Sequence, residues 1–149
     1  MNPYAAQQQY TNNLISTASP EQLLLMLYNG AIRFIRQAIT ASDNNNQIEK
    51  LGRISKAFAI IVEFSNTLNH DIGGEIAADL DALYQFMMRE LNKARNETDG
   101  KSLKTVEGLL IDLRDTWAEA IEINRKENEP KSFSDTASTT THAPLAVAG

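Results

Sequence analysis

Four stretches with helical spacing of apolar residues, joined by short polar turns, limit the fold of this chain more than any other feature. They cover about residues 20–40, 47–69, 74–96 and 102–126. In the last three stretches apolar side chains recur every three or four residues, which is the period of an α-helix with one buried face. Helices joined by such short turns lie next to each other in opposite directions. The sequence therefore predicts an all-α fold, an antiparallel up-down four-helix bundle.

The first helical stretch has a clear start but an unusually broad apolar face. Ser19 can cap a helix, Pro20 suits the first helical position, and Gln22 completes a capping box. The apolar residues that follow cover an arc of roughly 180° at about 100° per residue. A surface helix needs an apolar stripe only somewhat wider than about 100°. Leu25 borders the broad arc, and Met26 falls among polar residues. The sequence alone leaves open what covers this additional apolar surface.

Each of the other three stretches carries a second, shorter apolar stripe, displaced by roughly 90° from the main one on a helical wheel. These stripes contain Ala57, Ile60 and Phe64; Ala77, Tyr84 and Met88; and Leu109, Ala120 and Ile123. Two interpretations are open. The stripes are either flanks of the bundle core that are simply buried, or an exposed apolar groove that binds a helix or an extended segment of a partner.

The two ends of the chain differ in composition from its middle. Residues 1–18 form an arm that is too polar for a bundle helix, although Tyr10 and Leu14 are spaced to share a face. This arm either covers a groove until a partner displaces it or is an unstructured terminus. Residues 127–149 are mainly small and polar, so we expect them to be disordered, because they cannot bury enough surface to offset their ordering entropy. Residues 19–126 remain as the bundle domain.

Composition and charge argue against several classes of function. The 149 residues include no cysteine, so a disulfide, a thiol nucleophile and a cysteine metal site are excluded. The net charge is −5 and the Lys and Arg residues are scattered along the sequence, which argues against nucleic acid as the main partner. We find no secretory signal and no apolar run long enough to span a membrane. The sequence also lacks the His-Glu-x-x-His zinc motif and a phosphate-binding Gly-Lys-Ser/Thr loop.

His70 raises a second functional hypothesis, a histidine phosphotransfer bundle. Such a site needs an exposed imidazole in the middle of a helix and positive charge nearby to hold the phosphoryl group. Here Asp71 follows His70, and no Lys or Arg is adjacent. We expect Gly73 to end one helix in a left-handed conformation and Gly74 to start the next, which makes His70 a plain helix-end histidine. A third hypothesis is a self-assembling structural bundle whose additional apolar faces are buried in a homodimer.

Three short motifs occur in a fixed order along the chain. They are TASPE at residues 17–21 with MLYNGAI at 26–32; GGEIA at 73–77 followed by Leu80, Leu83–Tyr84 and Phe86–Met87; and Leu113–Arg114 with Trp117. Together with the Tyr-, Gln- and Asn-rich arm, they resemble the flagellin export chaperones of the FliS type. The resemblance covers about residues 1–126. Because the motifs keep their order and spacing in a cysteine-free helical chain, the match is specific.

The resemblance implies a small cytoplasmic bundle with no enzymatic activity and no cofactor. It implies that the chain binds the disordered C-terminal segment of flagellin, keeps flagellin from polymerising, and helps deliver it to the flagellar type III export gate. Other flagellar regulators are further possible partners, whereas nucleic acid and membrane insertion are not implied. The client-binding residues that we expect are Tyr10 and Leu14 as gate residues, and Ile60, Phe64, Ala77, Tyr84, Met88, Leu109 and Ile123 as groove lining. Leu83, Leu113 and Trp117 are expected in the core.

Overall fold

The computed structural model describes residues 3–130, except for the side chains of residues 14–16, and this part of the chain is all-helical without a strand. Its helices are α1 (Pro3–Thr17), α2 (Pro20–Asp43), α3 (Gln47–Asn66), α4 (His70–Ala94) and α5 (Lys101–Glu127). The chain divides into two compact units, residues 1–118 and 119–149, and α5 begins in the first and ends in the second. Most of the tail predicted to be disordered, residues 131–149, lies outside the described residues.

Side chains cap the first turns of the bundle helices. The Ser19 hydroxyl accepts a hydrogen bond from the Gln22 backbone N–H at 3.1 Å, and the Gln22 side chain accepts one from the Ser19 N–H at 3.0 Å. This geometry confirms the predicted capping box. Asn46 caps α3 and Asn69 caps α4 in the same way. Each cap satisfies a backbone donor that the helix itself leaves unpaired, which fixes where the helix begins.

The start of α4 differs from the prediction. We expected the helix to begin near Gly74, after a left-handed stop at Gly73. Instead α4 begins at His70, and the Gly73 N–H donates to the Asn69 carbonyl at 2.8 Å within the first turn. The positive φ falls on Gly74 (φ 51°, ψ −121°), where the helix is kinked. A Cβ atom at Gly73 would lie only 2.9 Å from the Cβ of Ala77, so the two glycines serve different purposes, close packing and a kink.

The N-terminal arm is a helix, which the polarity argument did not predict. Alanine and glutamine are good helix formers, and Pro3 occupies the first helical position. No residue of α1 belongs to the described hydrophobic core, as its polar sequence implies. Polarity therefore correctly predicted that the arm would not contribute to the core, but it did not predict the local backbone conformation.

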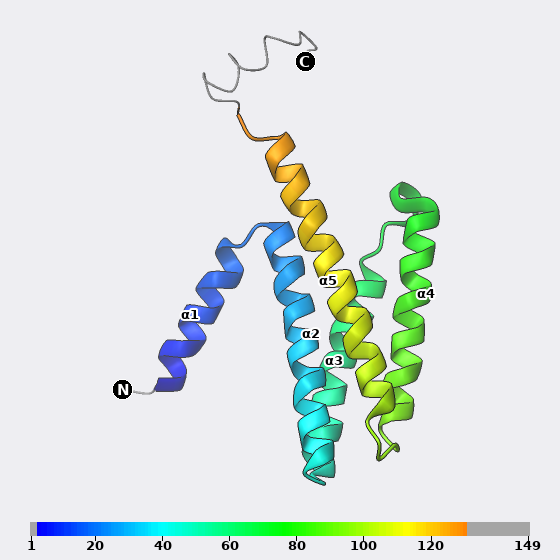
Figure 1. The fold of residues 1–149 in the computed structure, drawn as a ribbon. Helices are drawn as coiled ribbons and strands as arrows, with labels where there is room; N and C mark the ends of the chain where they lie inside the picture. The colour runs from blue at the N-terminus through cyan, green and yellow to red at the C-terminus, as the bar shows by residue number, and fades with distance from the viewer. Residues whose placement is uncertain (1–2, 131–149) are drawn as a thin grey trace. The chain divides into compact units, whose positions relative to one another are not determined.

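One hydrophobic core is formed by α2, α3, α4 and the first part of α5 (Figure 1). Its large buried side chains include Tyr28, Ile32, Ile35, Ile54, Ile61, Phe64, Tyr84, Met87, Leu91, Leu103, Val106 and Leu110. Leu113 and Trp117 pack against this core while remaining partly exposed, and Leu83 is also only partly buried. The main stripes predicted for α3 and α5 lie largely in or against the core. The stripe predicted for α4 is partly wrong, because Ile76 is 70% exposed whereas Ala77 and Tyr84 of the second stripe are buried.

Hydrogen bonds between the helices establish the direction of two pairs. Ser65, near the end of α3, donates to Asp81 in the first half of α4 at 2.6 Å. Gln47, at the start of α3, donates to the Arg95 carbonyl just after α4 at 3.0 Å. The two helices therefore run in opposite directions. The same holds for α2 and α5, since Tyr28 bonds with Trp117 and Arg36 with Glu107.

Glycine-to-alanine substitutions should separate a required glycine from a replaceable one. Gly74→Ala should lower the free energy of unfolding by about 1–3 kcal/mol, because a side chain is strained at its backbone angles. Gly52 is the control, because it is exposed within α3 and no atom lies within 4 Å of the position that its Cβ would occupy. Gly52→Ala should raise stability by about 0.5–1 kcal/mol. Urea unfolding followed by circular dichroism checks both values, and effects of the same sign would contradict the assignment.

Candidate functional site

Partly exposed apolar side chains surround the core on all four of its helices. They pack against the core without being fully covered, and they include Leu24, Leu27, Phe34, Ile39, Phe58, Ile60, Leu68, Leu80, Met88, Leu109, Ile111, Leu113 and Trp117. Side chains of this size are normally covered when a helix has a single buried stripe. Their exposed parts form an apolar surface of the kind that the second interpretation of the stripes expects, and we take it as the candidate binding surface.

Three of the predicted lining residues lie in the core itself. Phe64, Ala77 and Tyr84 are 3–4% exposed. The Phe64 ring stacks on that of Tyr28 with a centroid separation of 4.4 Å, and it lies 5.6 Å from the ring of Tyr84. Buried flanks are what the first interpretation of the second stripes expects. A partner could touch these three side chains only if the core opened.

The other predicted residues lie nearer the surface. Ile60, Met88 and Leu109 are partly buried at the edge of the core. Ile123 is 52% exposed and Tyr10 is 66% exposed, so both are available to a partner. The side chain of Leu14, the second predicted gate residue, lies outside the described residues. Stripes that appeared equivalent on a helical wheel are therefore divided between the core and its margin.

A hydrogen-bonded network within the core was not predicted. The hydroxyls of Tyr28 and Tyr84 lie 2.7 Å apart, and the Trp117 indole N–H donates to the Tyr28 hydroxyl at 3.2 Å. Burial raises the pKa of both tyrosine hydroxyls, so both stay protonated at neutral pH. The network satisfies polar groups that would otherwise be buried without partners, and a nucleophilic role is not favoured. The motifs contained these residues, but their spacing along the chain gave no signal that they meet.

The described residues offer little catalytic chemistry. His70 is exposed and is the first residue of α4, so it lies at the start of a helix and not before a helix stop at Gly73 as predicted. Among the described residues, no group of three or more His, Asp or Glu side chains is arranged to hold a metal ion. Within the same part of the chain, the helices are too short or too polar to cross a membrane.

Folding brings together Lys and Arg residues that are far apart in the sequence. Residues 33–56 and 89–104 each hold five of the 14 Lys and Arg residues, and the Gln47 and Lys50 bonds to the loop after α4 bring these segments together. The segment between them, residues 57–88, contains five acidic residues and no Lys or Arg. One end of the first unit is consequently basic and the opposite end is acidic.

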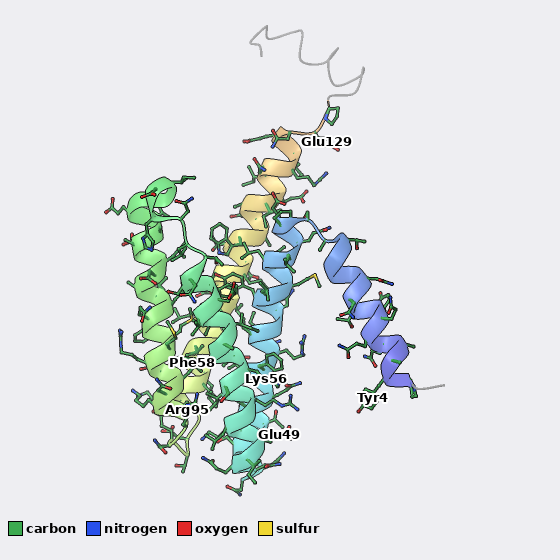
Figure 2. The ribbon with its side chains drawn as sticks, turned by 180° about the vertical axis from the view of Figure 1, so that it is seen from behind. Tyr4, Glu49, Lys56, Phe58, Arg95 and Glu129 are labelled. Atoms are coloured by element: carbon green, nitrogen blue, oxygen red, sulfur yellow. The ribbon has the colours of Figure 1, made fainter. Side chains whose placement is uncertain are left out.

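The basic end also carries partly exposed aromatic rings. The Arg95 guanidinium lies 6.0 Å from the ring centroid of Phe58 (Figure 2). Arg33 lies 5.3 Å and Lys56 lies 5.9 Å from the ring centroid of Phe34. These distances are within the range of cation–π contacts, which shield part of each ring from water.

Comparison with known proteins connects this helical chain to a family. The family model described as flagellar protein FliS matches residues 2–124. The chain belongs to the FliS family. The flagellar secretion chaperone FliS of Bacillus subtilis (strain 168) is 43% identical over 126 residues, which are 85% of this chain and 91% of the relative. The FliS chaperones of Salmonella typhimurium and Vibrio cholerae are 35% and 33% identical, each over 69% of this chain and 77% and 76% of the relative.

Membership in the FliS family confirms the resemblance found in the sequence motifs. It identifies the chain as a flagellar secretion chaperone and not an enzyme. In a chaperone, apolar side chains that are partly exposed at the margin of the core can contact a client while the core itself stays packed.

Proposed function

We propose that the chain binds the disordered C-terminal segment of flagellin in the cytoplasm, prevents its premature polymerisation, and aids its delivery to the flagellar type III secretion apparatus. The observation that carries this proposal is the set of apolar side chains left partly exposed around the core. The FliS family model and the chaperone names of the relatives support it.

Mass action explains how such binding prevents assembly. A chaperone that occupies apolar surface on the flagellin segment lowers the concentration of free segment available for polymerisation. A disordered client loses conformational entropy when it is ordered, so a long contact surface is needed for useful affinity. Partly exposed side chains distributed over four helices suit a client that extends along the bundle rather than one bound in a single deep pocket.

The proposal includes an antiparallel up-down bundle of residues 19–126 as the binding scaffold. The opposed directions of α3 and α4, and of α2 and α5, support this topology. Residues 1–18 are proposed as an arm that covers part of the groove, with Tyr10 and Leu14 as gate residues. Residues 127–149 are proposed as a tail without a fixed structure. No role in client binding is assigned to this tail.

The surface members of the predicted set carry the proposed client contacts. They are Ile60, Met88 and Leu109 at the margin of the core, and Ile123 in the exposed part of α5. Gly30 of α2 lies close to one of these residues, Ile60. The Ile60 Cδ1 atom is 3.7 Å from the position that a Cβ atom at residue 30 would occupy. Phe64, Ala77 and Tyr84 lie beneath this surface and would contribute by holding it in shape.

Calorimetric titration with a peptide covering the C-terminal segment of flagellin tests the proposal. We expect one-to-one binding with a negative heat-capacity change, which marks the burial of apolar surface. Deleting residues 1–18 should strengthen binding if the arm covers the groove. An absence of binding both before and after this deletion would show that the exposed apolar surface has another use.

A charge placed on the candidate surface should weaken client binding without unfolding the chain. Met88→Glu should weaken binding by about tenfold or more, because a carboxylate would lose its hydration in an apolar contact. Ala82→Glu, an exposed position on the same helix, is the matched control and should leave affinity unchanged. Titration and thermal melts on both variants check this. Equal affinities in two folded variants would remove Met88 from the client surface.

A further inference from the structure

The outer face of α2 is hollowed along most of its length. Two adjoining hollows, each about 460 Å³, share Asn29. The first lies at the start of α2, where its lining includes Leu25 and Met26. The second continues along the helix, where its lining includes Arg33 and Gln37. We call these two adjoining hollows, whose lining also includes Glu49 of α3 and Arg114 of α5, the α2 groove.

The apolar side chains that line the first half of the α2 groove do not belong to the hydrophobic core. Leu24 and Leu27 pack against the hydrophobic core, whereas Leu25 and Met26 are partly buried but do not join that packing. These are the two residues that the helical wheel placed at the border and outside the broad apolar arc. Their side chains line the groove instead.

The second half of the groove offers a cation that has no carboxylate partner among the described residues. Arg36 forms an ion pair with Glu107 at 2.7 Å, and Arg114 forms one with Asp115 at 3.1 Å. Arg33 lies between them in the lining, is exposed, and makes no ion pair within the described part of the chain. Its guanidinium rests only over the Phe34 ring. An anion entering this half would therefore meet an uncompensated charge.

The same half also holds a hydrogen-bond acceptor without a donor. The side-chain oxygen of Gln37, Oε1, is buried and has no hydrogen-bond partner among the described residues. A buried amide oxygen left unpaired costs about 1–3 kcal/mol, so native structures rarely leave one in this state. Gln37 lines the hollow that contains Arg33, and a ligand seated there supplies the missing donor once the Gln37 side chain turns its oxygen toward the hollow.

We propose that the α2 groove is a second docking surface, which binds a protein segment carrying apolar and acidic side chains on one face. Met26 and Arg33 are seven residues apart, which is about 10 Å along a helix. A helical segment with an apolar side chain and a carboxylate seven positions apart matches this distance. Its apolar residues contact Leu25 and Met26, its carboxylate pairs with Arg33, and a polar side chain donates to Gln37.

The chemistry of the groove distinguishes this partner from the alternatives. The arm of this chain is a poor occupant of the basic half, because residues 3–17 contain no Asp or Glu. A nucleic acid would satisfy Arg33 but would leave Leu25 and Met26 uncovered. The predicted client residues come from α3, α4 and α5, whereas Leu25, Met26, Arg33 and Gln37 of the groove belong to α2. The two surfaces border each other, because Ile60 and Arg33 both lie within 4 Å of the position that a Cβ atom at Gly30 would occupy.

A capped synthetic helix of about 16 residues, with two leucines one turn apart and two glutamates seven positions further along the same face, is the probe. Titration of the isotope-labelled full chain, followed by NMR, should shift the amide signals of α2 and the side-chain amide of Gln37. Arg33→Glu should weaken binding by about tenfold or more, because it replaces attraction by repulsion. Arg89→Glu, an exposed arginine of α4 outside the groove, makes the same change of charge and should leave binding unchanged.

Further measurements separate the apolar contribution to probe binding from the contribution of charge. Replacing both Leu25 and Met26 with serine should weaken the probe about tenfold, and a probe with lysines in place of its glutamates should bind no more tightly than background. Equal losses for Arg33→Glu and Arg89→Glu, shifts outside α2, or tighter binding of a single-stranded oligonucleotide would each overturn the proposal. The flagellin peptide should bind the variant with serine at residues 25 and 26 with unchanged affinity, and Met88→Glu should leave the affinity for the probe unchanged. Failure of the client proposal and failure of this one are therefore distinguishable.

Discussion

Replacing Phe64 with alanine is expected to lower the free energy of unfolding by about 3–5 kcal/mol, the usual range for removing a buried phenylalanine. The ring is 4% exposed and stacks on Tyr28 at a centroid distance of 4.4 Å. It also lies 5.6 Å from the ring of Tyr84. Alanine would leave a cavity next to the hydroxyl pair of these two tyrosines and would loosen the part of the core where α2, α3 and α4 meet.

Chemical unfolding followed by both far-ultraviolet circular dichroism and Trp117 fluorescence measures this loss. Trp117 is a suitable reporter because its indole donates to the Tyr28 hydroxyl. Phe34→Ala is the matched control, since Phe34 is only partly buried and lies beside Arg33 and Lys56. We expect it to cost about 1–2 kcal/mol, in keeping with smaller burial.

The comparison also decides the role of Phe64. If Phe64→Ala keeps nearly full stability but loses affinity for the flagellin peptide, the ring contacts the client directly and its burial in the free chain is reversible. If stability falls as predicted and Phe34→Ala is mild, the ring is a core residue and its effect on binding follows from the disturbed scaffold.

Replacing Lys50 with alanine is expected to cost about 2–4 kcal/mol. Lys50 is 2% exposed, and its ammonium group donates to the Glu97 carbonyl in the loop between α4 and α5. Glu97 in turn accepts hydrogen bonds from the backbone and hydroxyl of Ser102, at the start of α5. Alanine would remove both the buried methylene stem and the donor that holds this loop.

Lys50→Met separates the two contributions. Methionine has a similar length and keeps the packing of the stem, but it leaves the Glu97 carbonyl without its donor, so we expect a cost of about 1–2 kcal/mol. Hydrogen exchange at residues 95–102 should accelerate in both variants, because the loop loses its anchor. Unchanged exchange in this loop would show that the Lys50 ammonium does not hold it.

Local patterns predicted much of the fold. The capping box at Ser19 and Gln22 depends on residues only three positions apart, so sequence reading found it and the structure confirmed it. The helical stretches were also found, but their ends shifted: α2 continues to Asp43 and α4 begins at His70. Turn residues tolerate several conformations, and the positive φ falls on Gly74 rather than on Gly73.

The candidate site was predicted less completely. A helical wheel shows which residues share a face, and it grouped Phe64 with Ile60 and Tyr84 with Met88. It does not show how closely the neighbouring helix approaches that face. In the structure one member of each pair is buried and the other lies at the margin. The difference comes from contacts between residues far apart in the chain.

By itself, the sequence determined the helical class, the caps, the absence of cysteine chemistry and the family, because each depends on residue type and short-range spacing. Tertiary structure decided which apolar stripes are covered and where the charges gather. The ten Lys and Arg residues of segments 33–56 and 89–104 meet at one end only because α3 and α4 run in opposite directions. Periodicity fixes the face on which a side chain lies, whereas helix packing determines whether that face meets another helix or water.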